Sequence, residues 1–171
     1  MRRIQRILCL VISFLAFTTA APAQTIPKVL WGKWRVRRDL PTTTISCWGE
    51  SDAKKLIGTE IEYSADLFRW QKVSVKHPIA EAKVVTADQF ATDNSAMDAN
   101  GSQVNFREIG IKAKSVEQIS IQHPPASITG ATIEIPGDEV WVRGPHTIIF
   151  SVCNVYFEAK RFTPKQKETK H

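Results

Sequence analysis

The chain has 171 residues, of which 43% are hydrophobic, and it carries a formal net charge of +6 at pH 7. Most of that excess lies at the two ends, since residues 24–163 contain 17 basic and 16 acidic residues. A nucleic-acid-binding face needs Lys and Arg clustered on the folded domain, so the charge distribution argues against nucleic-acid binding. The length suits one domain with one core, and no repeat or low-complexity linker is present.

Residues 1–23 have the layout of a secretory signal peptide. Three arginines precede an apolar run over residues 7–17, and small residues end the segment at Ala21-Pro22-Ala23. The apolar run is shorter than the roughly 20 residues of a permanent membrane anchor, which is the alternative interpretation. We therefore expect cleavage after Ala23, export to the periplasm or the medium, and no stable membrane insertion afterwards.

Two cysteines, Cys47 and Cys153, remain once this leader is removed. Exported proteins meet oxidising conditions, in which such a pair closes far more often than it serves as a thiolate nucleophile. The sequence therefore predicts a disulfide between Cys47 and Cys153.

The first folded element expected in the chain is a half-buried strand over residues 31–38, where apolar and charged residues alternate. Pro41 ends it, because proline cannot donate to a sheet ladder. A short helix is predicted over residues 51–58, with Ser51 as its N-cap and Gly58 at its end.

Short strands dominate the rest of the chain. The segment 67–75 is predicted as one strand with a bulge, ended by His77-Pro78, and the spacing of Thr86 and Gln89 predicts a single helical turn. Further strands are expected over 59–64, 103–107, 116–122, 131–135, 139–143, 146–152 and 155–161. Eight to ten short strands with little helix predict an all-β antiparallel barrel over residues 24–163, with a β-sandwich as the alternative.

Gly32-Lys33-Trp34 on the first strand and Arg161 on the last resemble the calycin superfamily, which includes lipocalins and fatty-acid-binding proteins. The resemblance implies a lipocalin-like barrel in which Trp34 closes one end and Arg161 packs over the indole. Gly32 fits this expectation, because little space remains beside an indole at a barrel end. The short helix after the first strand resembles the helical lid of fatty-acid-binding proteins. Residues 164–171 are polar and basic, and we expect them to be a disordered tail.

The chemistry-bearing residues do not form a recognisable catalytic or metal motif. The four histidines are scattered, and no cofactor fingerprint is present, so we expect no metal, no cofactor and no catalytic residues. An enzyme is disfavoured but left open. The four histidines are His77, His123, His146 and His171.

Large aromatic residues recur on many of the predicted strands and are the candidate lining of a ligand pocket in the barrel interior. They are Trp48, Phe68, Trp70, Phe106, Trp141 and Phe150. The same side chains can instead fill the interior completely. The leading hypothesis is an exported, non-enzymatic protein that binds a small apolar molecule. The alternative is a solid barrel that binds another exported protein as an inhibitor or envelope component. The sequence does not predict the oligomeric state.

Overall fold

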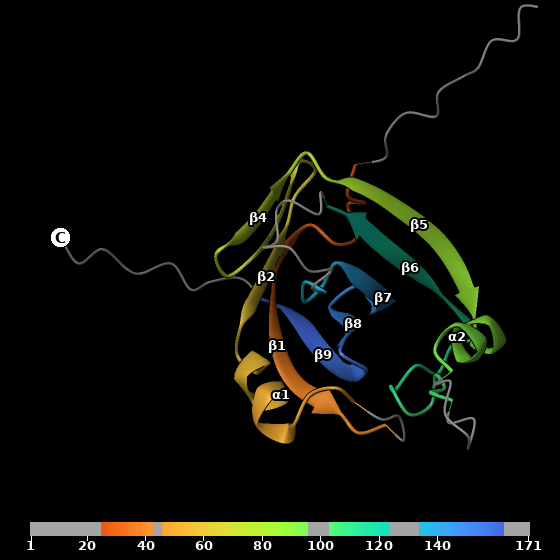
Figure 1. The fold of residues 1–171 in the computed structure, drawn as a ribbon. Coiled ribbons are helices and arrows are strands. Elements are labelled where there is room, and N and C mark those ends of the chain that lie inside the picture. Colours follow the sequence, from red (N-terminus) through yellow and green to blue (C-terminus); the bar gives the residue numbers. More distant parts are fainter. Residues whose placement is uncertain (1–24, 43–45, 96–102, 124–133, 163–171) are drawn as a thin grey trace, which may run out of the picture.

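The computed structural model describes residues 25–42, 46–95, 103–123 and 134–162, which fold into nine strands and two short helices (Figure 1). The predicted leader, the whole predicted tail and residues 131–133 of the predicted strand 131–135 lie outside the described residues. The helices are α1 (Glu50–Leu56) and α2 (Ala87–Asp93). The strands are β1 (Gly32–Leu40), β2 (Glu60–Tyr63), β3 (Leu67–Trp70), β4 (Val73–Lys76), β5 (Ile79–Thr86), β6 (Ser115–Gln122), β7 (Glu139–Gly144), β8 (Thr147–Val152) and β9 (Val155–Phe162).

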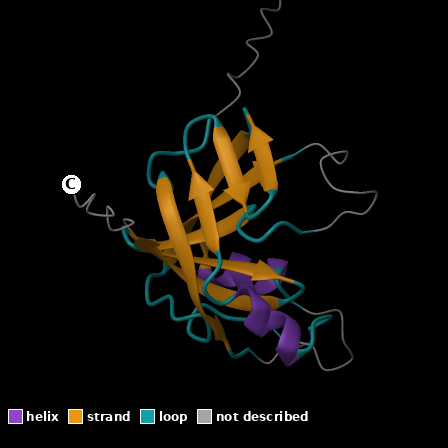
Figure 2. Ribbon diagram, turned by 90° about the vertical axis from the view of Figure 1, so that its left-hand side faces the viewer, coloured by secondary structure: helices purple, strands orange, loops and turns teal. Residues whose placement is uncertain are grey.

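All nine strands belong to one antiparallel sheet in the order β4-β3-β2-β1-β9-β8-β7-β6-β5. The sheet curls into a half-barrel, and both helices lie toward its lower end in the two views (Figures 1 and 2). The predicted all-β, barrel-like fold is confirmed. The first and last strands are neighbours in mid-sheet, with Trp34 opposite Arg161 in the register.

The hydrogen-bonded ladder is open between β4 and β5, which are consecutive in the chain and form the two edges of the described sheet. His77 and Pro78 join them. His77 has a φ of 49°, which is not an extended conformation, and Pro78 has no N–H to donate. The chain therefore passes from β4 to β5 without hydrogen bonds forming between these two strands.

Four local predictions need correction. Ser51 is not the N-cap of α1, because the helix begins at Glu50 and Gly49 is its N-cap. Residues 67–75 are not one bulged strand but the hairpin β3–β4, whose turn contains Gln71 at a φ of 51°. The predicted strand 103–107 is a turn in which Asn105 Oδ1 accepts the N–H groups of Arg107 and Glu108. The predicted helical turn at Thr86 is a seven-residue helix, and the expected capping box between Thr86 and Gln89 is present.

The buried side chains form two cores on opposite faces of the sheet. The interior core receives residues from all nine strands, among them Trp34, Phe68 and Phe150. The second core lies on the other face of the β5–β9 part of the sheet, where α2 and residues 104–111 cover it. Val140 enters the interior core and its neighbour Trp141 the second one, as strand alternation requires.

A non-strand segment, residues 134–138, packs into the interior core. Ile135, Pro136 and Gly137 are buried, and the Tyr63 hydroxyl donates a hydrogen bond to the Gly137 carbonyl at 2.7 Å. A Cβ atom on Gly137 would lie 2.5 Å from the Tyr63 Oη atom and 2.9 Å from a methyl carbon of Ile61. Only glycine therefore fits between this segment and β2.

Replacing Gly137 by Ala should lower the free energy of unfolding by about 2 to 4 kcal/mol, because it adds a clash to an unfavourable φ of +88°. Gly58→Ala is a matched control, since Gly58 has the same φ but no atom within 4 Å of the added Cβ. The control should lose only about 1 kcal/mol. Chemical denaturation of both variants gives the comparison, and equal losses would contradict tight packing at Gly137.

Candidate functional site

Trp34 and Arg161 meet where β1 pairs with β9, at one end of the half-barrel. The Trp34 side chain is fully buried, and its Nε1 donates to the Leu30 carbonyl at 2.6 Å. The Arg161 guanidinium carbon lies 4.3 Å from the centre of the Trp34 ring, which is the contact predicted from the sequence. A guanidinium stacked on an indole keeps its edge free for hydrogen bonds. Here that edge donates to three backbone carbonyls, those of Val29, Trp31 and Pro145.

Gly32 lies next to this guanidinium. Its φ is +115°, and an added Cβ would be 3.2 Å from Arg161 Nη1. Glycine is therefore favoured at this position both by its backbone conformation and by the closeness of the arginine.

The six candidate aromatic residues do not share one interior. Phe68 and Phe150 are fully buried in the interior core, and Trp48 and Trp70 pack against it while partly exposed. Phe106 and Trp141 belong to the second core, so their predicted interior position is wrong. Trp141 alternates with Val140 and Val142 along β7 and therefore points to the opposite face.

Cys47 and Cys153 form the predicted disulfide, with Cα atoms 5.4 Å apart. The Cys153 carbonyl also accepts hydrogen bonds from the Cys47 N–H at 3.3 Å and from the Ser46 hydroxyl at 2.8 Å. The segment before α1 is thus fastened to the β8–β9 turn both covalently and by the backbone.

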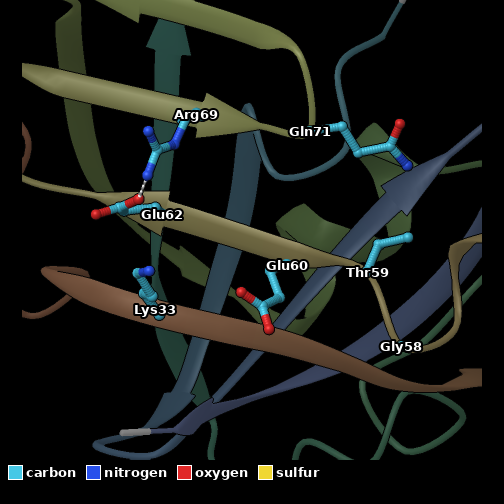
Figure 3. A pocket seen from close by; sticks show the side chains of 7 residues that line it. All are labelled: Lys33, Gly58, Thr59, Glu60, Glu62, Arg69 and Gln71. Carbon is cyan, nitrogen blue, oxygen red and sulfur yellow. Dashed lines mark hydrogen bonds and ion pairs between the residues drawn. The ribbon is translucent and has the colours of Figure 1, made fainter. Parts of the chain in front are cut away.

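One polar cleft, of about 380 Å³, lies on the outside of β1, β2 and β3 (Figure 3). Arg69 pairs with Glu62 across β2 and β3, and Glu60 pairs with Arg35 of β1 at 2.7 Å. Each of these two ion pairs is neutral, and exposed ion pairs of this kind contribute little to stability. We assign this cleft no function. Its lining is Lys33, Gly58, Thr59, Glu60, Glu62, Arg69 and Gln71.

A more unusual charge arrangement surrounds Glu158 on β9. The Glu158 side chain is only 4% exposed, yet its Oε2 accepts hydrogen bonds from Arg38 at 3.3 Å and from Arg143. Lys160 Nζ is 3.8 Å from the other carboxylate oxygen. Arg38 and Arg143 also line a cleft of about 530 Å³ next to residues 110–113. We call these four side chains the Glu158 cluster.

The Glu158 cluster changes the acidity of its carboxylate. Burial alone raises the pKa of Glu158, but the hydrogen bonds and charges of Arg143 and Arg38 outweigh it and hold this pKa below its ordinary value of 4.5. Stability from ionised Glu158 is therefore fully present above pH 4.5 and is lost as the pH falls through the lowered value.

Replacing Glu158 by Gln should lower the free energy of unfolding by about 1 to 3 kcal/mol at pH 7, and the deficit should shrink below pH 4.5. Urea denaturation of both proteins between pH 7 and pH 3 measures it. Burial raises the pKa of Asp138 and of Glu139. Because both groups titrate in the native protein and in the variant, their contributions cancel when the two free energies of unfolding are subtracted. Glu60→Gln, in an exposed pair, is the control; a deficit for Glu158→Gln that is independent of pH would contradict the ionic role.

The described histidines do not converge on one another. His123 Nε2 lies 3.3 Å from Asp138 Oδ2, which also accepts the Ile135 N–H at 3.0 Å. Within the described ranges, no three His, Cys, Asp or Glu side chains are placed to hold a metal ion. In the same part of the chain, no helix is both long and apolar enough to cross a membrane.

Comparisons with protein families, with curated proteins and with solved structures give no match. The residues that sequence reasoning missed are those of the Glu158 cluster. A signal was present, because Glu158 interrupts the otherwise apolar run 155–159. A carboxylate in a buried strand needs a paired cation.

Proposed function

We propose that this protein is an exported, non-enzymatic interaction module, a filled barrel that binds another exported protein on its outer surface. The observation that supports the proposal is the packing of the interior. Trp34, Tyr63, Phe68 and Phe150 are essentially without solvent contact there, and residues 134–138 pack among them. A drug-sized ligand needs a pocket of about 300 Å³ or more, and these packed side chains occupy the space that such a pocket would need.

Export and an oxidising compartment are part of the proposal. Support comes from the leader-like residues 1–23 and from the Cys47–Cys153 disulfide. The lipocalin-like resemblance rests on Gly32, Trp34 and Arg161, whose side-by-side arrangement at the barrel end is what such a barrel needs.

The competing function is an apolar ligand held among Phe68, Trp70 and Phe150. For such a ligand to fit, residues 134–138 would have to leave the interior core, which would remove the hydrogen bond from Tyr63 and expose Ile135. This rearrangement makes the ligand-binding hypothesis the less favoured of the two.

Native mass spectrometry after mild cross-linking in the producing cells tests the proposal. We expect a stoichiometric complex with another polypeptide and no co-purifying small molecule. A small apolar molecule retained at one equivalent would overturn the proposal in favour of ligand binding. Failure to cross-link any protein would also contradict it.

A further inference from the structure

Two surface clefts lie beside residues 110–112, outside the barrel interior. The first is the 530 Å³ cleft at the Glu158 cluster, and the second has a volume of about 660 Å³. The two clefts share Gly110, Ile111 and Lys112, so they adjoin along one segment of chain. We call the two together the arginine groove.

Positive charge dominates the arginine groove. Arg38, Arg143 and Lys160 surround the single carboxylate of Glu158, so two positive charges are unbalanced within that cluster. Lys112 adds another cation to both clefts and Arg107 one to the second. The nearby Glu108 does not offset them fully, and its carboxylate already accepts the Asn105 N–H at 3.2 Å.

Arg143 is held in position before any ligand arrives, and Arg38 lies beside it at the rim of the groove. Arg143 is 22% exposed and packs against Gly110 so closely that a Cβ there would lie 2.8 Å from its Nη1. Arg38 is 62% exposed at the rim, and both donate to the buried Glu158. Each guanidinium has five N–H donors, so donors remain for a second anion. A side chain that is already ordered loses little entropy on binding.

Apolar side chains complete the groove. The buried Ile111 lines both clefts, Val116 lines the first, and Phe106 lines the second. Guanidinium groups recognise carboxylates through paired N–H donors, while an apolar wall suits aliphatic side chains. A segment carrying both acidic and aliphatic residues matches this combination.

We propose that the arginine groove binds an acidic segment of a partner protein, with one partner carboxylate bound by Arg38 and Arg143. This inference rests on the proposed function, because it names the chemistry of the partner that the outer surface binds. Residues 24–163 carry nearly balanced charge, so the cations of the groove form a local site, whereas a nucleic acid requires an extended basic face.

A fluorescently labelled, end-capped decapeptide of alternating Glu and Leu is the probe, and the same peptide with Gln for Glu is its control. By fluorescence anisotropy, the Glu peptide should bind at least about tenfold more tightly, because charge-assisted hydrogen bonds are about twice as strong as neutral ones. Arg38→Gln should weaken binding about tenfold. Arg37→Gln removes the same charge from the adjacent residue, which lines neither cleft, and should change the affinity less than twofold.

Circular dichroism and the melting temperature establish that both variants remain folded. Equal affinity for the Glu and Gln peptides, or equal weakening in the two variants, would overturn the inference. Tighter binding of a single-stranded oligonucleotide than of the Glu peptide would also overturn it. A cross-linked partner together with no peptide binding would reject the groove while leaving the proposed function standing.

Discussion

Replacing Trp34 by Ala should lower the free energy of unfolding by about 3 to 5 kcal/mol, and Arg161→Ala by about 1 to 3 kcal/mol. Trp34 is fully buried, so its removal leaves a large cavity at the barrel end. Arg161 lies over the indole and donates to three carbonyls, so its removal leaves those acceptors unpaired. The double variant should lose less than the sum of the two, because the residues share one contact.

Chemical denaturation of the four proteins of this cycle gives the coupling energy. Arg161→Lys should not rescue the loss, because an ammonium cannot stack on the ring and reach three carbonyls at once. Arg35→Ala is the control. Arg35 lies 4.2 Å from the Phe162 ring in a similar stack, but it pairs with the exposed Glu60 carboxylate instead of backbone carbonyls, and its loss should be under about 1 kcal/mol. Additivity within about 0.3 kcal/mol for Trp34 and Arg161 would contradict the stacked contact between the two side chains.

Removing the disulfide by Cys47→Ala and Cys153→Ala together should lower the free energy of unfolding by about 4 to 5 kcal/mol. The two cysteines are 106 residues apart, and the chain-entropy model gives a loss of that size for such a loop. Because the backbone contact between Cys47 and Cys153 does not depend on the sulfur atoms, the variant should keep its native circular dichroism spectrum.

Thiol titration of the chain from Gln24 onward supplies the second measurement for the disulfide. The native protein should contain no titratable thiol, and its reduced form should match the stability of the double variant. Two titratable thiols in the native protein would show that the pair is open.

The contact between Trp34 and Arg161 was predictable from the sequence because Gly32, Trp34 and Arg161 have unusual steric and stacking properties. The hairpin β3–β4 was not, because its turn at Gln71 and Lys72 contains no Gly, Pro, Asn or Asp to mark it. The face of Trp141 was misassigned because α2 and residues 104–111 bury the outer side of β7. Alternation cannot tell which face is the interior when both faces are buried.

The Glu158 cluster shows a different limit. Arg38 and Glu158 are 120 residues apart in sequence and Arg143 and Glu158 are 15 apart, so no local pattern connects the three. Only the pairing of β1 with β9 brings Arg38 opposite Glu158. The apolar run around Glu158 signals a buried carboxylate but does not identify its partners.

The pairing of β1 with β9 also constrains how the chain folds in time. Within β1–β4 and within β5–β9, each strand pairs with its neighbour in sequence, so these two groups can form early. Trp34 and Arg161 meet only after a long loop closes. That seam should therefore form late. Cys47 and Cys153 lie near the other end of these two strands. A disulfide formed before β1 and β9 pair already holds the two strands close together, so the loop that must still close is shorter. Refolding should therefore be faster from the oxidised chain than from the reduced one.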